Sequence, residues 1–160
     1  MRVLVVCSGN ICRSPMAAAY LRRRIAHTPL AHTIVDSAGT LGIEAAAADR
    51  HARKAMDEIS IPIEDHRSRG IRASDLNSSD WVLVMDHAHL EWLAQHHPHG
   101  AGERMLLRAF EQGPTPDPDA PDLEDPIGQS LGKFRQQRDL IVRCIDHFIQ
   151  HLKRLELQSR

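Results

Sequence analysis

The sequence predicts a single α/β domain over residues 1–160, with three layers built around a four-stranded parallel sheet. Short runs rich in β-branched residues alternate with longer segments of helical periodicity, which is typical of a parallel sheet covered on both faces. The chain has 160 residues, of which 42% are hydrophobic, enough to bury one core. A short glycine-containing segment follows the first apolar run, and it predicts a phosphate-binding loop after the first strand.

The predicted elements begin with a strand over 2–6, a loop, and then a helix. Ser14 and Pro15 predict the N-cap and first residue of that helix, which continues to about residue 26. Residues 111–126, rich in proline and acidic residues, predict a surface loop. The remaining predicted strands cover 33–37, 81–85 and 105–108, and the remaining predicted helices cover 47–59, 88–95 and 131–157.

The segment Cys7–Ser14 has the composition of an anion-binding loop. It lies between a strand and a helix, so its backbone N–H groups and the helix N-terminus can point at one anion. Gly9 permits a tight turn, and Arg13 offers a planar fork to two phosphoryl oxygens. The same surroundings stabilise a thiolate at Cys7, which is a nucleophile for phosphorus. The predicted phosphate-binding residues are Ser8, Gly9, Asn10, Ile11, Cys12, Arg13 and Ser14.

Phosphoryl transfer to sulfur also requires a proton donor for the leaving oxygen. A carboxylic acid on a segment facing the loop would supply the proton, and five acidic residues between 117 and 125 of the acidic loop at 111–126 are candidates. Asp125 lies nearest the final helix, but spacing alone does not choose among them. The candidates are Asp117, Asp119, Asp122, Glu124 and Asp125.

The sequence resembles the low-molecular-weight protein tyrosine phosphatases along its whole length. The similarity begins with VCSGNICRSPMA at 6–17 and continues through SAGT at 37–40, VMD at 84–86 and DPIG at 125–128. The resemblance implies a phosphomonoester hydrolase that acts on phosphorylated protein or small aryl phosphates and releases inorganic phosphate. It implies a phosphocysteine intermediate and neither a metal nor another cofactor.

The resemblance also implies the catalytic residues. Cys7 would be the nucleophile, and Arg13 would bind the phosphoryl oxygens and stabilise the transition state. Asp125 would be the general acid, and later the base for the attacking water.

Further residues are implied to support this chemistry. Asn10 would hold the loop in shape through side-chain hydrogen bonds, with Ser37 as a partner, and Ser14 would hydrogen-bond the Cys7 sulfur. Cys12 is implied to form a reversible disulfide with Cys7 under oxidation, which would protect an activated thiolate from irreversible oxidation.

Three positions bear on the substrate. Ile127 and Ile43 stand at or near places where many family members carry aromatic residues that grip a phosphotyrosine ring. Ile11 stands where the protein arginine phosphatases of the family typically carry threonine, which favours phosphotyrosine, whereas the missing aromatic residues count against it. Phosphoarginine hydrolysis by the same loop is one alternative. A phospho-ligand-binding or redox-sensing module without catalysis is another.

Composition excludes several other classes. The chain has 20 basic residues (Lys and Arg) against 21 acidic ones, so no nucleic-acid partner is expected. No apolar run is long enough for a membrane helix, so no membrane partner is expected. Three cysteines do not form a disulfide framework, and no signal-peptide pattern is present, so the sequence favours the cytoplasm. Cys144 is predicted to lie in the core. The histidines between 87 and 99 lack the spacing of a helical metal site and predict a surface helix and turn.

Overall fold

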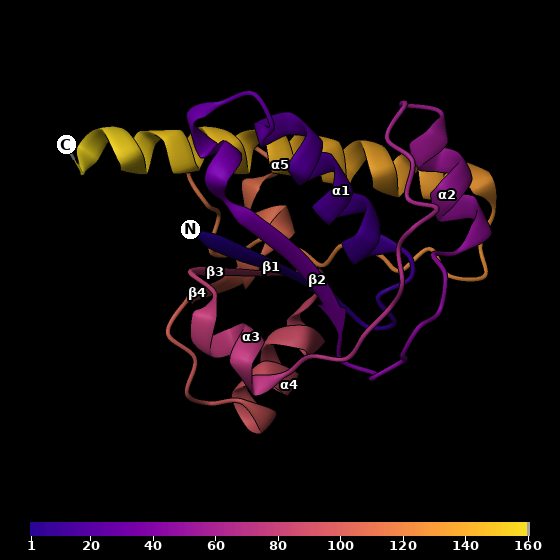
Figure 1. Ribbon diagram of the computed structural model, residues 1–160, viewed down its shortest axis with the longest axis horizontal. Coiled ribbons are helices and arrows are strands. Elements are labelled where there is room, and N and C mark those ends of the chain that lie inside the picture. The colour runs from indigo at the N-terminus through magenta and orange to yellow at the C-terminus, as the bar shows by residue number, and fades with distance from the viewer. Residues whose placement is uncertain (160) are drawn as a thin grey trace.

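The structure is a computed structural model that describes residues 1–159. Its centre is one sheet of four parallel strands in the order β2-β1-β3-β4, with helices on both faces (Figure 1). The predicted fold class is therefore confirmed. Within the described residues, no helix is both long enough and apolar enough to cross a membrane.

The strands are aligned so that the loops following them meet at one edge of the sheet. In the register, Cys7 pairs with Gly39 on one side, and Val6 pairs with Val84 on the other. The residues just after each strand are thus brought together, as expected at the carboxyl ends of a parallel sheet. The strands are β1 (Arg2–Cys7), β2 (Ile34–Gly39), β3 (Trp81–Val84) and β4 (Glu103–Leu106).

The helices form two layers of unequal size (Figure 1). The long helix α5 lies beside α1 and α2 on one face, whereas the two short helices α3 and α4 lie on the other. Two 3-10 helices, over Pro29–His32 and Leu107–Phe110, complete the connections. The α-helices are α1 (Arg13–Ile25), α2 (Arg50–Asp57), α3 (Ala73–Ser78), α4 (His87–His96) and α5 (Leu131–Gln158).

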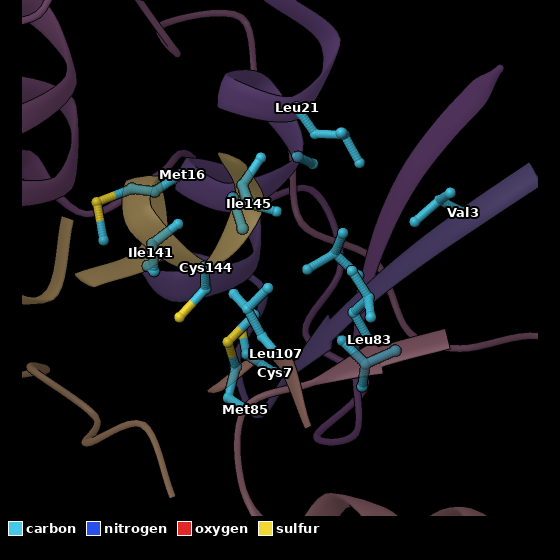
Figure 2. Packing of buried hydrophobic residues seen from close by; sticks show 14 of the residues in the cluster. Val3, Cys7, Met16, Leu21, Leu83, Met85, Leu107, Ile141, Cys144 and Ile145 are labelled. Atoms are coloured by element: carbon cyan, nitrogen blue, oxygen red, sulfur yellow. The ribbon is translucent and has the colours of Figure 1, made fainter. Parts of the chain in front are cut away.

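The larger part of the core lies between the sheet and the α1–α5 layer. Figure 2 shows side chains of both helices packed together with side chains of β1 and β3. Cys144 is fully buried here, as predicted, and burial raises the pKa of its thiol to about 12. Other labelled members of this cluster are Met16, Leu21, Ile141, Ile145, Val3 and Leu83.

Several predicted boundaries differ from the structure. The last strand ends at Leu106, because Leu107–Phe110 forms a 3-10 helix whose apolar side chains pack against α5 instead of extending the sheet. The second helix is shorter than predicted, since Asp49 accepts a hydrogen bond from the His51 N–H and caps it. The short helix α3 was not predicted, and it buries only one residue, Leu76.

The start of the first helix also differs from the prediction. It begins at Arg13 with Cys12 in the N-cap position, and Pro15 is its third residue. Ser14 does not cap the helix, because its hydroxyl is hydrogen-bonded to the side chains of Cys7 and Asn10. A residue that looked like a helix cap thus belongs to the loop before it.

Candidate active site

The shape of the 7–14 loop depends on Asn10, which is buried and has a positive φ of 56°. Asparagine is one of the few residues that tolerate this conformation. Its amide nitrogen donates to Ser14 Oγ at 2.8 Å and to Ser37 Oγ at 2.9 Å, while its amide oxygen accepts the Arg69 N–H at 3.0 Å. One side chain therefore ties the loop to helix α1, strand β2 and the segment around residue 69.

The end of strand β2 lies against the same loop. The Thr40 N–H donates to the Cys7 carbonyl and the Leu41 N–H donates to the Ser8 carbonyl, both at 3.0 Å. Gly39 is required by this close approach, since a Cβ there would lie 2.5 Å from the Ser8 carbonyl oxygen. This contact accounts for the glycine of the SAGT segment, which forms the end of β2.

Cys7 lies at the end of β1 with two hydrogen-bonding groups directed at its sulfur. Its Sγ lies 2.9 Å from Ser14 Oγ and 3.2 Å from the backbone nitrogen of Asn10, which donates to it. Because the Asn10 amide already donates to Ser14 Oγ, the Ser14 hydroxyl proton is free to point at the sulfur. Both contacts stabilise a thiolate more than a thiol.

Arg13 is held in a fixed orientation although it is almost fully buried. Its Nη1 donates to the Leu123 carbonyl at 2.7 Å and lies 3.4 Å from Asp86 Oδ2, the carboxylate that caps helix α4. Its Nη2 lies 3.5 Å from Asp125 Oδ2. The guanidinium therefore joins the 7–14 loop, helix α4 and the acidic loop.

Asp125 is the member of the acidic loop that lines the same cavity as the cysteine. It lines a cavity of about 140 Å³ together with Cys7 and Arg13. The four other candidates do not line this cavity. The Asp122 carboxylate accepts a hydrogen bond from His87, and the Asp117 carboxylate accepts one from the Asp119 N–H. Glu124 Oε2 lies 3.8 Å from Lys133 Nζ. The choice that spacing left open thus falls on Asp125, although its role in the reaction stays a prediction.

The phosphate-binding residues predicted from sequence divide into two groups. Asn10 and Ser14 are buried and do not line the cavity, and together with Ser37 they support the shape of the loop. The others face the cavity and are Ser8, Gly9, Ile11, Cys12 and Arg13.

The mouth of the cavity is bordered by three exposed aliphatic side chains, Leu41, Ile43 and Ile127, which we call the aliphatic rim. Their exposed fractions are 67%, 38% and 47%. Trp81 and Phe110 pack edge to face against Phe148 of α5, and none of the three lines the cavity. Among the described residues, none of those that line the cavity is aromatic.

Two histidines have environments that the sequence did not indicate. The Nε2 of His66 donates to the Asn10 carbonyl at 2.6 Å, and the residue does not line the cavity. The sequence predicts a surface position for His89, whereas the residue is 97% buried and contacts Ser8 of the loop. Asp86 and His89 form a capping box after β3, in which each side chain accepts the other's backbone N–H. Their spacing in the sequence is the signal that could have indicated this position of His89.

Cys12 is buried at the N-terminus of α1 and borders the cavity with Cys7. Burial raises the pKa of its thiol, and the carboxylates of Asp49 and Asp125 act in the same direction. Cys12 is therefore suited to remain a thiol while Cys7 reacts, and its pairing with Cys7 under oxidation stays a prediction. In the described chain, no group of three or more His, Cys, Asp or Glu residues is arranged to hold a metal ion.

Comparisons with known proteins identify the family of this chain. The family model described as "Low molecular weight phosphotyrosine protein phosphatase" matches residues 2–158. A curated relative, the probable low molecular weight protein-tyrosine-phosphatase EpsP of Ralstonia nicotianae, is 33% identical over 96% of this chain and 97% of its own length.

Two solved structures have the same fold. The YwlE arginine phosphatase from Geobacillus stearothermophilus superposes with a TM-score of 0.87 at 30% identity, covering 99% of this chain and 97% of that one. A YwlE mutant with a phosphorylated active-site serine superposes with a TM-score of 0.85 at 29% identity, covering 96% of each chain.

Proposed function

Because the chain belongs to the low molecular weight phosphotyrosine protein phosphatase family, we propose that it hydrolyses phosphotyrosine in proteins through a phosphocysteine at Cys7. The observation that carries the proposal is the convergence of three groups on one cavity. Cys7 is hydrogen-bonded through its sulfur, Arg13 is fixed beside it, and Asp125 lines the same cavity. These are the nucleophile, the oxyanion-binding group and the acid that the reaction requires.

In the first step, the Cys7 thiolate attacks phosphorus, so that the S–P bond forms as the P–O bond to the tyrosine ring breaks. Asp125, as a carboxylic acid, donates its proton to the leaving phenolate oxygen. Arg13 and the backbone N–H groups of the loop bind the equatorial phosphoryl oxygens, where charge is concentrated in the transition state. The products are a tyrosine residue and S-phosphocysteine.

In the second step, water attacks the phosphorus of the phosphocysteine. Asp125, now a carboxylate, accepts a proton from this water as its oxygen bonds to phosphorus. The S–P bond breaks, and the electron pair returns to Cys7 as a thiolate that the Ser14 hydroxyl and the Asn10 N–H stabilise. Inorganic phosphate leaves, and the starting state of the enzyme is restored.

The apolar lining supports phosphotyrosine rather than phosphoarginine. Ile11 and the aliphatic rim present hydrocarbon to whatever extends from the phosphoryl group. A phenyl ring gains by burial against such a surface, whereas a guanidinium group loses hydration there unless polar partners replace it. Phosphoarginine remains the second candidate, because the chain is about as similar to YwlE as to EpsP.

The test compares turnover of matched peptides that carry phosphotyrosine or phosphoarginine at one position. We expect kcat/KM for the phosphotyrosine peptide to be at least about tenfold higher, and a reversed preference would assign the chain to the arginine phosphatases. Cys7→Ser is the control, and it should abolish hydrolysis while inorganic phosphate still binds. Full activity in that variant would end the proposal.

A further inference from the structure

Ser8 and His89 form a contact that joins the loop to helix α4. Ser8 Oγ lies 2.9 Å from His89 Nε2, although the two residues are 81 positions apart in the sequence. His89 is almost fully buried, and Ser8 is the first residue of the loop after the nucleophile. The contact places a fixed imidazole directly behind one wall of the cavity.

The other nitrogen of His89 determines which group donates in this contact. The backbone N–H groups of Met85 and Asp86 both donate to His89 Nδ1, at 3.3 and 3.2 Å. Asp86 Oδ1 also lies 3.3 Å from Nδ1, but it accepts the backbone N–H of His89. With two N–H donors directed at it, Nδ1 is assigned as the unprotonated nitrogen, and the neutral ring has its proton on Nε2. Burial lowers the pKa of His89, which keeps the ring in this neutral form near pH 7.

The Ser8 hydroxyl is consequently left with a proton to donate. Its oxygen accepts from His89 Nε2, so its own O–H must find another acceptor. Among residues 1–159, Ser8 Oγ has no hydrogen-bond partner other than His89. Ser8 borders the cavity together with Cys7 and Arg13, so an oxyanion bound there is available as the acceptor.

From this arrangement we infer that the Ser8 hydroxyl is an additional oxyanion donor of the site, aimed at a phosphoryl oxygen by the Nε2–H of His89. The inference rests on the proposed function, since it assumes that a phosphoryl group occupies the cavity beside Cys7. Ser8 touches the ligand in this scheme, whereas His89 acts through Ser8 and is a positioning residue.

The experiment measures the dissociation constant of inorganic phosphate by calorimetry for four proteins: wild type, Ser8→Ala, His89→Asn and the double variant. Loss of one hydrogen bond to a charged group should weaken phosphate binding about five- to tenfold in Ser8→Ala. His89→Asn should weaken it by a similar or smaller factor. In the double variant, the asparagine should cause no further loss, because the group that His89 orients is already absent.

Asparagine is chosen because its Oδ1 occupies nearly the position of Nδ1. It can still accept the Met85 and Asp86 N–H groups, but it cannot reach Ser8 as Nε2 does. His96→Asn is the matched control on the same helix, where His96 Nδ1 bonds only the Trp92 carbonyl at the exposed end, and it should leave phosphate affinity unchanged. Melting temperatures of all variants report whether the helix cap has survived.

Two outcomes would overturn the inference. One is unchanged phosphate affinity in Ser8→Ala. The other is an equal loss from His89→Asn in the presence and absence of the Ser8 hydroxyl, which would mean that His89 serves the fold alone. Failure of the wild-type protein to bind phosphate would instead contradict the proposed function, so the two failures are distinguishable.

Discussion

At the scale of single residues, the site depends on buried polar side chains that each contact several separate segments. The amide of Asn10 makes three hydrogen bonds to three separate segments, and Arg13 is shared among a carbonyl and two carboxylates. Each of these groups is buried, so removing a partner would leave an unsatisfied polar atom. The geometry around Cys7 is thus fixed before any substrate arrives.

Asp125 offers the sharpest residue-level prediction. Asp125→Asn should lower kcat for phenyl phosphate about 10²–10⁴-fold, since the amide cannot protonate the leaving oxygen. The loss should shrink for phosphate esters of more acidic phenols, which need less protonation. Steady-state kinetics across a series of aryl phosphates measures both effects. Asp122→Asn is the control, because Asp122 is directed at His87 rather than at the cavity, and an equal loss there would contradict the assignment.

At the scale of elements, the end of β2 and the 7–14 loop form one packed unit. Gly39→Ala should force the loop to shift, because the added Cβ would approach the Ser8 carbonyl oxygen and the Asn10 nitrogen to 2.5 and 3.0 Å. Such overpacking costs about 1–3 kcal/mol. We expect a lower melting temperature and phosphate binding weakened by about tenfold or more. Gly113→Ala is the matched control, since a Cβ there meets nothing within 4 Å, and unaltered phosphate binding in Gly39→Ala would refute the argument.

The elements also show why sequence predicted part of the structure and not the rest. β1 and β3 are continuous apolar runs buried on both faces, and such runs need no tertiary information to be read as strands. β4 lies at the edge of the sheet and has only one buried residue, Leu106, so its limits were misplaced. Helix α3 is six residues long with a single buried leucine, too short for a periodic pattern.

The same distinction between local patterns and long-range contacts applies to the residues of the site. Cys7, Asn10, Arg13 and Ser14 are close in sequence, so their pattern was visible before the fold was known. His89 and the Leu123 carbonyl reach the site only through the topology, and a backbone carbonyl leaves no signature in a sequence. Long-range contacts of this kind are what pattern reading misses.

At the scale of the whole molecule, the buried His89 and the half-buried His66 link folding to pH. Burial lowers the pKa of both His66 and His89 below the value of about 6.5 expected in the unfolded chain. For His89, the nearby Asp86, Asp122 and Asp125 oppose this shift and Arg13 adds to it. For His66, the Asn10 carbonyl opposes the shift, whereas Arg22 and Arg67 add to it.

The sign of the pH effect follows from these lowered values. The stability that neutral histidines contribute is fully present above about pH 6.5, and it is lost as pH falls through the folded-state pKa values. The free energy of unfolding should therefore decrease between pH 6.5 and 5, by at most about 1.4 kcal/mol per pH unit for each histidine. Urea unfolding across this range measures it. His66→Gln and His89→Asn should each flatten the slope, and an unchanged slope in both would exclude these histidines as the cause.

The aliphatic rim has an evolutionary consequence. Leu41, Ile43 and Ile127 project from loops and remain largely exposed, so replacing them costs the fold little. Cys7, Arg13 and Asn10, in contrast, are buried and tied to several elements, so they cannot change without loss of the site. Substitutions in the rim can therefore change which phosphorylated side chains are accepted while the buried residues of the site stay the same. One ancestral protein can in this way give rise to enzymes with different substrate preferences.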